Sequence, residues 1–248
     1  MRFVFIKVFR FKRTYLGAIV IAAVLLLAGL NSVFALNPVT PATSWAVANR
    51  VIVVDPGHGG VDPGATGYNG ITEKEIVLQV AKRLSSLLNH AGAKVIMTRD
   101  SDKDLSGPGS GNLSARKKED LTKRVQLANE GRADLYISVH VNAFPSSRWS
   151  GAQTFYQRNQ QEGKKLAESI QSELIRILGN TTREAKAEDF FTTRNTKMAG
   201  VIVEIGFLSN PREAKLMTNA AYQRKLAYAI YSGLVKYYRE QLPLENRP

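Results

Sequence analysis

The apolar run 51–54, followed by Asp55, Pro56 and Gly57, constrains the fold more than any other stretch of the chain. Four β-branched residues in succession predict a buried strand, and the proline and glycine behind them predict a turn. His58 therefore lies just beyond the C-terminal end of a strand. That edge is where open α/β sheets bind ligands, although a single Gly-His-Gly turn is also typical of an ordinary surface loop.

Segments with strand and helix patterns alternate along the rest of the chain. Thr72 with Glu75 three residues later is a capping-box pattern, which predicts a helix to about His90 and leaves Glu73 free to point toward the loop of His58. The other predicted strands are 94–98, 135–139, 151–156 and 200–204, and the other predicted helices are 115–129, 161–178, a segment from Asn210, and 220–239. Residues 180–197 predict a loop with one short strand near 190–193. The alternation predicts a single α/β domain, with a mostly parallel mixed sheet flanked by helices.

The N-terminal segment has the pattern of an export signal. Basic residues within positions 1–13 precede an uncharged apolar run at 16–30, and the positive flank of such a segment stays in the cytoplasm. Small residues near Ala35 offer a cleavage point, whereas 16–36 is about long enough to span a bilayer of ~20 residues. A cleaved signal peptide and a retained membrane anchor both remain open, and either predicts an extracytoplasmic protein.

These patterns divide the chain into four expected regions. They are a signal or membrane helix (1–36), a linker rich in Pro and Thr (37–49), a folded domain (50–242) and a short tail (243–248). The absence of cysteine excludes disulfides and thiolate metal ligands. The net charge is +13, and without the five cations of positions 1–13 it is +8; such a surface suits an anionic partner, which charge alone leaves open as nucleic acid, membrane or wall polymer.

Three predicted strands end in residues that can bind a metal or transfer a proton, namely His58, His140 and Glu204. If these strands are parallel neighbours, their C-terminal ends converge, and Glu73 at a helix N-terminus can join them. Two imidazoles and one carboxylate are a ligand set of catalytic zinc, and the remaining carboxylate can act as a general base. Taken singly, each residue also fits an ordinary role, such as a core histidine, a buried ion-pair partner or a helix-dipole acid.

Six motifs occur in order along the predicted domain. They are DPGHGG at 55–60, DPGA at 62–65, EK at 73–74, Arg124 with AN at 128–129, SVHVNA at 138–143 and EIGFLSN at 204–210. Together they resemble the zinc-dependent N-acetylmuramoyl-L-alanine amidases of the type 3 family, over nearly the whole predicted domain. Further segments at 97–102, 116–121, 149–153 and 180–186 are similar to the spore-cortex amidases of endospore formers.

By this resemblance His58, Glu73 and His140 bind zinc, and Glu204 is the catalytic glutamate. The implied reaction cleaves the amide between N-acetylmuramic acid and the L-alanine of the peptidoglycan stem peptide. The spore-cortex subgroup implies a role in muramic-δ-lactam formation and germination. The resemblance also implies peptidoglycan and an activating protein as partners, and no nucleic acid, whereas the contact with the membrane is expected from the N-terminal segment.

Some roles rest on position alone. Asp55 and Asn142 are candidates for orienting His58 and His140 through hydrogen bonds. The aromatic residues Phe144, Trp149 and Tyr156 near strand ends are expected to pack rather than to line a glycan groove. Two other functions stay open: a zinc carboxypeptidase acting elsewhere on the stem peptide, and a non-catalytic wall-binding protein.

Overall fold

The computed structural model describes residues 45–67, 70–109 and 111–242. Its elements in chain order are η1 (Trp45–Val47), β1 (Val51–Pro56), α3 (Glu73–His90), β2 (Lys94–Met97), α4 (Leu113–Glu130), β3 (Leu135–Asn142), β4 (Gln153–Tyr156), α5 (Gln161–Leu178), β5 (Lys186–Ala187), α6 (Phe191–Asn195), β6 (Ala199–Phe207), α7 (Pro211–Met217) and α8 (Ala220–Glu240). The predicted signal or membrane helix and the predicted tail lie outside the described residues. Among the described helices, none is long and apolar enough to cross a bilayer.

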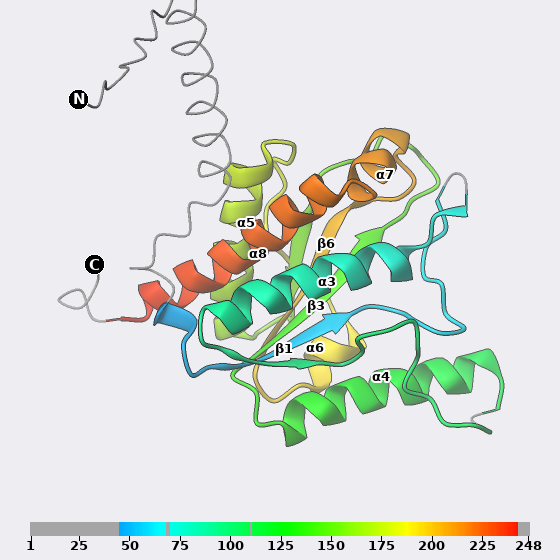
Figure 1. The fold of residues 1–248 in the computed structure, drawn as a ribbon, viewed down its shortest axis with the longest axis horizontal. Coiled ribbons are helices and arrows are strands. Elements are labelled where there is room, and N and C mark those ends of the chain that lie inside the picture. The colour runs from blue at the N-terminus through cyan, green and yellow to red at the C-terminus, as the bar shows by residue number, and fades with distance from the viewer. Residues whose placement is uncertain (1–44, 68–69, 110, 243–248) are drawn as a thin grey trace, which may run out of the picture. The chain divides into compact units, whose positions relative to one another are not determined.

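One six-stranded sheet, in the order β2-β1-β3-β6-β4-β5, runs through the domain. Figure 1 labels its central strands β1, β3 and β6. The pairs β1–β2, β1–β3, β3–β6 and β4–β5 are parallel, and β4 pairs antiparallel with β6. The expected mostly parallel mixed sheet is confirmed. Because β1, β3 and β6 are parallel neighbours, their C-terminal ends meet at one edge.

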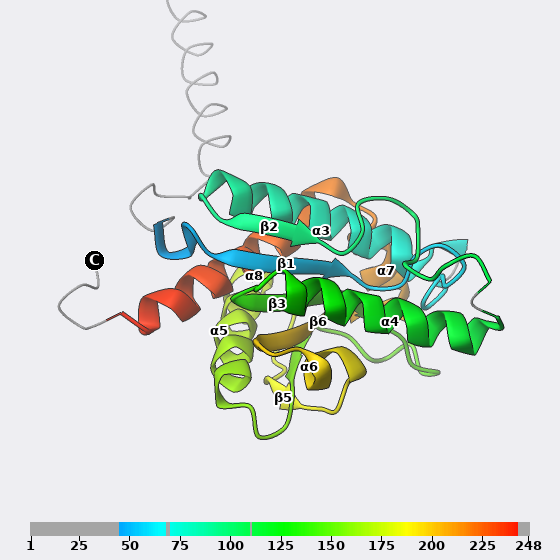
Figure 2. The ribbon, with the colours of Figure 1, turned by 90° about the horizontal axis from the view of Figure 1, so that it is seen from below.

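Helices cover both faces of the sheet (Figure 2). The larger core joins α3, α5 and α8 to the face that carries Val201, Val203 and Ile205 of β6. On the other face, Val53 of β1 and Tyr136 of β3 pack against Ala128 of α4. Successive strand residues point to opposite faces, so the odd-numbered residues of β6 fill the main core, which leaves Ile202 and Glu204 on the side of α4 and α6.

The structure corrects two predictions at the margins of the domain. Residues 45–47, assigned to the linker, form a 3-10 helix with Ala46 and Val47 buried in the main core. Residues 191–195, within the region predicted to hold a short strand, form the helix α6, and the strand of this region is β5. Strand and helix periods cannot be told apart over so few residues, so packing decides the conformation.

Close packing between α5 and α8 depends on Gly233. A methyl group there would overlap the backbone of Ile170, whereas one at Gly163 of α5 would meet the flexible end of the Gln160 side chain. Overpacking costs about 1–3 kcal/mol, and alanine gains ~1 kcal/mol over glycine within a helix. Because Ile170 presents backbone, we expect Gly233→Ala to lower the free energy of unfolding and Gly163→Ala to leave it unchanged or higher, as measured by urea denaturation. Equal stability of the two variants would contradict this packing.

Candidate metal centre

Glu73, the first residue of α3, lies between the two histidines at the sheet edge. Its Oε2 is 3.3 Å from Nε2 of His58, and its Oε1 is 3.0 Å from Nδ1 of His140. The backbone N–H groups of Ala65 and Val141 each donate a hydrogen bond of 2.8 Å to the same carboxylate. The expectation that Glu73 points toward the loop of His58 is confirmed. Glu75, by contrast, accepts the capping hydrogen bond from the Thr72 N–H at 3.5 Å.

His58, Glu73 and His140 each offer one ligand atom, and these atoms lie within 4.8 Å of one another. The two imidazole rings meet edge to face, with centroids 5.0 Å apart. The three residues come from the turn after β1, the start of α3 and the end of β3, so the predicted convergence of strand ends brings them together. This cluster has the donor types of a divalent metal site.

The charges of the cluster favour a cation. Burial disfavours the charged form of Glu73, but hydrogen bonds from His140 and His58 outweigh it and hold the pKa of Glu73 well below its usual range. Burial likewise opposes a charged His58, yet the Asp62 and Glu73 carboxylates raise the pKa of His58 to about 9. A buried carboxylate flanked by two imidazoles therefore requires a positive charge, which a proton or a metal ion can supply.

Asp62 orients His58, a role that the sequence had assigned to Asp55. The Oδ2 atom of Asp62 lies 2.8 Å from Nδ1 of His58, and its Oδ1 accepts a hydrogen bond from the Gly64 N–H. This contact leaves Nε2 of His58 facing Glu73. The signal for Asp62 was its place in the DPGA motif, but the path of a glycine-rich turn does not follow from the sequence.

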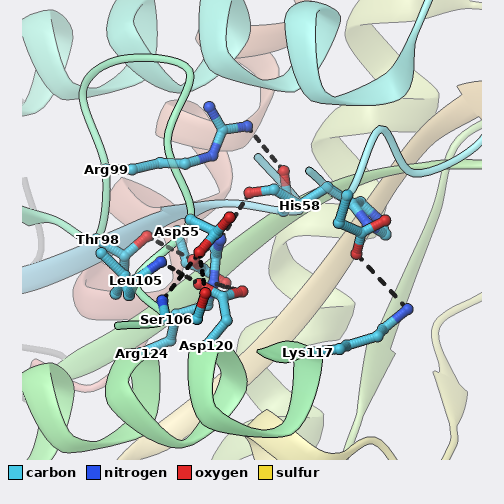
Figure 3. A network of polar contacts seen from close by, with 12 residues as sticks. Asp55, His58, Thr98, Arg99, Leu105, Ser106, Lys117, Asp120 and Arg124 are labelled. Carbon is cyan, nitrogen blue, oxygen red and sulfur yellow. Dashed lines mark hydrogen bonds and ion pairs between the residues drawn. The ribbon is translucent and has the colours of Figure 1, made fainter. Parts of the chain in front are cut away.

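Asp55 instead lies at the centre of a buried network of polar contacts next to the site (Figure 3). Its buried carboxylate accepts hydrogen bonds from Thr98 Oγ1 at 2.5 Å, Tyr136 OH at 2.5 Å and Ser138 Oγ at 2.7 Å, and it pairs with Nη1 of Arg124 at 2.6 Å. Burial raises the pKa of Asp55, but Arg124 and the three hydroxyl donors together hold it well below its usual range.

Two buried guanidinium groups fix the turn that carries His58 (Figure 3). Arg124 donates to main-chain carbonyls of the turn 56–58 at 2.8 and 2.6 Å. Arg99 donates to carbonyls of the same turn at 3.0 and 2.8 Å, and to the carbonyl of Lys74 at 2.9 Å. Since Lys74 follows Glu73, Arg99 fixes the position of His58 relative to Glu73.

The role expected for Asn142, orienting His140, stays a prediction. The main-chain carbonyl of Asn142 accepts a hydrogen bond from the Leu208 N–H.

Glu204 lies next to the cluster as the β6 neighbour of His140 across the parallel pair. It lines a cavity of about 150 Å³ together with both histidines, Phe190 and Lys117. Its Oε2 atom is buried and has no hydrogen-bond partner within the described part of the chain. Burial raises the pKa of Glu204 to about 7, which suits a group that accepts and returns a proton near neutral pH.

The family model of N-acetylmuramoyl-L-alanine amidase matches residues 52–236. The chain belongs to this amidase family. Its sequence is 47% identical, over 80% of this chain and 84% of the relative, to the germination-specific N-acetylmuramoyl-L-alanine amidase of Bacillus subtilis. It is 39% identical to the amidase LytC of the same organism, over 81% of this chain but only 39% of LytC.

Solved structures agree with this assignment. The CwlD amidase from Clostridioides difficile, solved in complex with the GerS lipoprotein, superposes with a TM-score of 0.75 at 38% identity, covering 76% of this chain and 98% of that one. The catalytic domain of the amidase CwlV from Bacillus (Paenibacillus) polymyxa gives 0.67 at 30% identity, covering 76% and 97%. The resemblance based on six motifs is confirmed.

The Asp55 network predicts how the stability of this amidase depends on pH. The pKa of Asp55 is lower in the folded chain than the unfolded value of about 3.9, so its contribution is present above that pH and lost as the pH falls below it. Replacing one partner of a buried pair costs about 3–5 kcal/mol. We expect Asp55→Asn to be less stable than the wild type by a similar amount above about pH 5, with the difference shrinking below about pH 4.

Urea unfolding between pH 3 and pH 7 measures this difference. The matched control is Asp100→Asn, because Asp100 pairs with Lys103 at the exposed surface. That substitution should leave the unfolding curve of the amidase unchanged. A difference between Asp55→Asn and the wild type that does not vary with pH would contradict the role of the Asp55 charge.

Proposed function

We propose that this chain uses a zinc ion, held by His58, Glu73 and His140, to hydrolyse the amide between N-acetylmuramic acid and L-alanine in peptidoglycan. The observation that carries the proposal is the buried, unpaired oxygen of Glu204 beside a cluster of three ligands. A metal site of three protein ligands leaves a position for the reactants, and amide hydrolysis also needs a group that moves a proton.

The donor set fits zinc, since two imidazole nitrogens and one carboxylate oxygen are among its catalytic ligand sets. When bound, zinc supplies Lewis-acid polarisation of the amide carbonyl and of the attacking water. Asp62 accepts a hydrogen bond from Nδ1–H of His58 and so keeps Nε2 directed toward the site. Glu204 accepts the proton that the water loses during attack and returns it to the departing alanine nitrogen.

The biological setting follows from the relatives. The match with a germination-specific amidase, over most of the length of both chains, supports action on spore-cortex peptidoglycan and thereby in muramic-δ-lactam formation and germination. Peptidoglycan lies outside the cytoplasm, which agrees with the export signal expected in residues 1–36. A relative solved in complex with a lipoprotein supports an activating protein partner for this chain as well.

Metal analysis tests the ligand set. We expect one zinc ion for each purified chain, and its loss in His140→Ala and Glu73→Gln, because the first removes a ligand and the second replaces a charged ligand oxygen by a neutral one. His90→Ala is the matched control, since His90 lies at the exposed C-terminus of α3 and contacts the Ser86 carbonyl. Elemental analysis after dialysis, with circular dichroism to confirm folding, gives the result. A folded His140→Ala protein that retains stoichiometric zinc would remove His140 from the site.

The role of Glu204 is tested by Glu204→Gln, which keeps the shape of the side chain but cannot accept a proton from water near neutral pH. General-base catalysis contributes about 10²–10⁴-fold, so we expect a rate loss of that order with zinc content unchanged. Glu184→Gln, an exposed glutamate, is the control. Mass spectrometry of digested peptidoglycan should show peptide-free glycans and stem peptides with a free L-alanine terminus. Shortened stems still attached to muramic acid would indicate a carboxypeptidase, and no products a wall-binding protein.

A further inference from the structure

Glu204 is connected to a second group of side chains on β4 and beyond. Gln153 of β4 is its direct neighbour across the antiparallel pair with β6, so both side chains lie on the same face of the sheet. Nη1 of Arg183 donates a hydrogen bond of 3.2 Å to Oε1 of Gln153. The same guanidinium lies 5.6 Å from the ring centre of Trp149 and 4.8 Å from that of Phe207. Gln153, the strand neighbour of Glu204, and its partner Arg183 therefore lie between Glu204 and an aromatic group.

We call Phe144, Trp149, Phe207 and Arg183 the aromatic shelf. Phe207 is buried and forms its base, with the Phe144 ring stacked on it at 5.9 Å and 28°. Phe144 and Trp149, 6.2 Å apart, are 50% and 42% exposed. The sequence predicted that these aromatic residues would pack, yet two of them face solvent. Clustered exposed aromatic groups on a soluble domain are a common sign of a binding surface.

Phe144 and Trp149 of the shelf belong to one loop, which is held in place by the segment that follows Glu204. The side-chain amide of Asn210 donates to the carbonyls of Ser147 and Trp149, at 3.0 and 3.2 Å. Ser209 Oγ accepts from the Phe144 N–H at 3.2 Å. Because the loop is ordered before any ligand arrives, binding there costs little conformational entropy. The shelf is therefore fixed relative to Glu204.

The two sides of Glu204 differ in the shape of ligand that they suit. On the side of α4 and α6, Phe190, Phe191 and Lys117 line the half-open cavity of about 150 Å³. On the side of β4, the shelf presents exposed rings, and the guanidinium groups of Arg183 and Arg148 lie 5.6 and 5.3 Å from the Trp149 ring centre. The substrate of the proposed reaction also has two halves, a single peptide and an extended sugar strand. An open surface suits the strand, since it continues in both directions past the cleaved bond.

We propose that the aromatic shelf is a binding subsite for the sugar strand of peptidoglycan. The C–H face of a pyranose ring presents apolar hydrogens that match the negative face of Trp149 or Phe144. Arg183 adds N–H donors for sugar hydroxyl and acetamido oxygens. This inference rests on the proposed function, because it assigns one half of that substrate to one side of Glu204. It directs the stem peptide toward the half-open cavity that Lys117 lines.

The first test measures sugar binding without any reaction. Linear oligomers of N-acetylglucosamine, which carry no peptide and no cleavable amide, are titrated into the full chain by calorimetry. We expect Trp149→Ala to weaken binding about tenfold, Trp149→Phe to retain most of it because a ring face remains, and Trp45→Ala to bind as the wild type. Trp45 is a matched control because it is 46% exposed and lies in η1. Equal binding by Trp149→Ala and the wild type would overturn the proposal.

The second test uses kinetics on glycan strands of several disaccharides that bear stem peptides. We expect Trp149→Ala and Phe144→Ala to raise KM about tenfold with kcat and melting temperature unchanged, because the shelf touches no reacting atom. A fall in kcat at constant KM would contradict a binding subsite. If the wild type released no stem peptide, the proposed function would be wrong. The titration would still show whether the aromatic shelf binds sugar. If the wild type cleaved but Trp149→Ala kept its KM and its sugar affinity, the shelf alone would fail.

Discussion

The arrangement of the candidate metal site depends on the contacts of the Glu73 carboxylate. A buried carboxylate is costly unless donors and positive charge surround it. Glu73 obtains two donors from the backbone at Ala65 and Val141, and it faces the imidazoles of His58 and His140. These contacts come from three segments that are distant along the chain. The first residue of α3 thereby sets the distance between the turn after β1 and the end of β3, and its charge requires that a cation be shared among them.

The turn after β1 is held from below in an uncommon conformation. His58 has a φ of 59°, a value that residues other than glycine seldom adopt. Arg99 and Arg124 bind carbonyls of this turn, and Asp55 neutralises Arg124. Gly57 is required for a different reason, because a methyl group there would overlap the imidazole ring of His140. The polar network around Asp55 therefore supports the candidate metal site by fixing the backbone rather than by contacting the imidazole rings or the Glu73 carboxylate.

Local signals made much of this edge predictable from the sequence. The β-branched run before Asp55 and the capping box at Thr72 act within a few residues, so β1 and α3 were predicted with correct positions. The meeting of His58 and His140 followed from the general geometry of parallel strand ends. Asp62 was missed because its contact depends on the path of a turn. The exposure of Trp149 was missed because Asn210, 61 residues away, holds its backbone, and no local pattern reports such a contact.

The different surroundings of Glu73 and Glu204 explain how two glutamates at one site can have separate roles. Glu73 is surrounded by backbone and imidazole donors, which keep its pKa well below the usual range and the side chain ionised. Glu204 is half-buried, its buried Oε2 has no hydrogen-bond partner among the described residues, and desolvation raises its pKa to about 7. Environments that separate the pKa values of two neighbouring acids also separate their chemistry. A permanently charged carboxylate suits a metal ligand, whereas one that is readily protonated near neutral pH suits proton transfer. The proposed roles, metal ligand for Glu73 and proton transfer for Glu204, thus follow from the position of Glu73 at the start of α3 and of Glu204 beside His140 on β6.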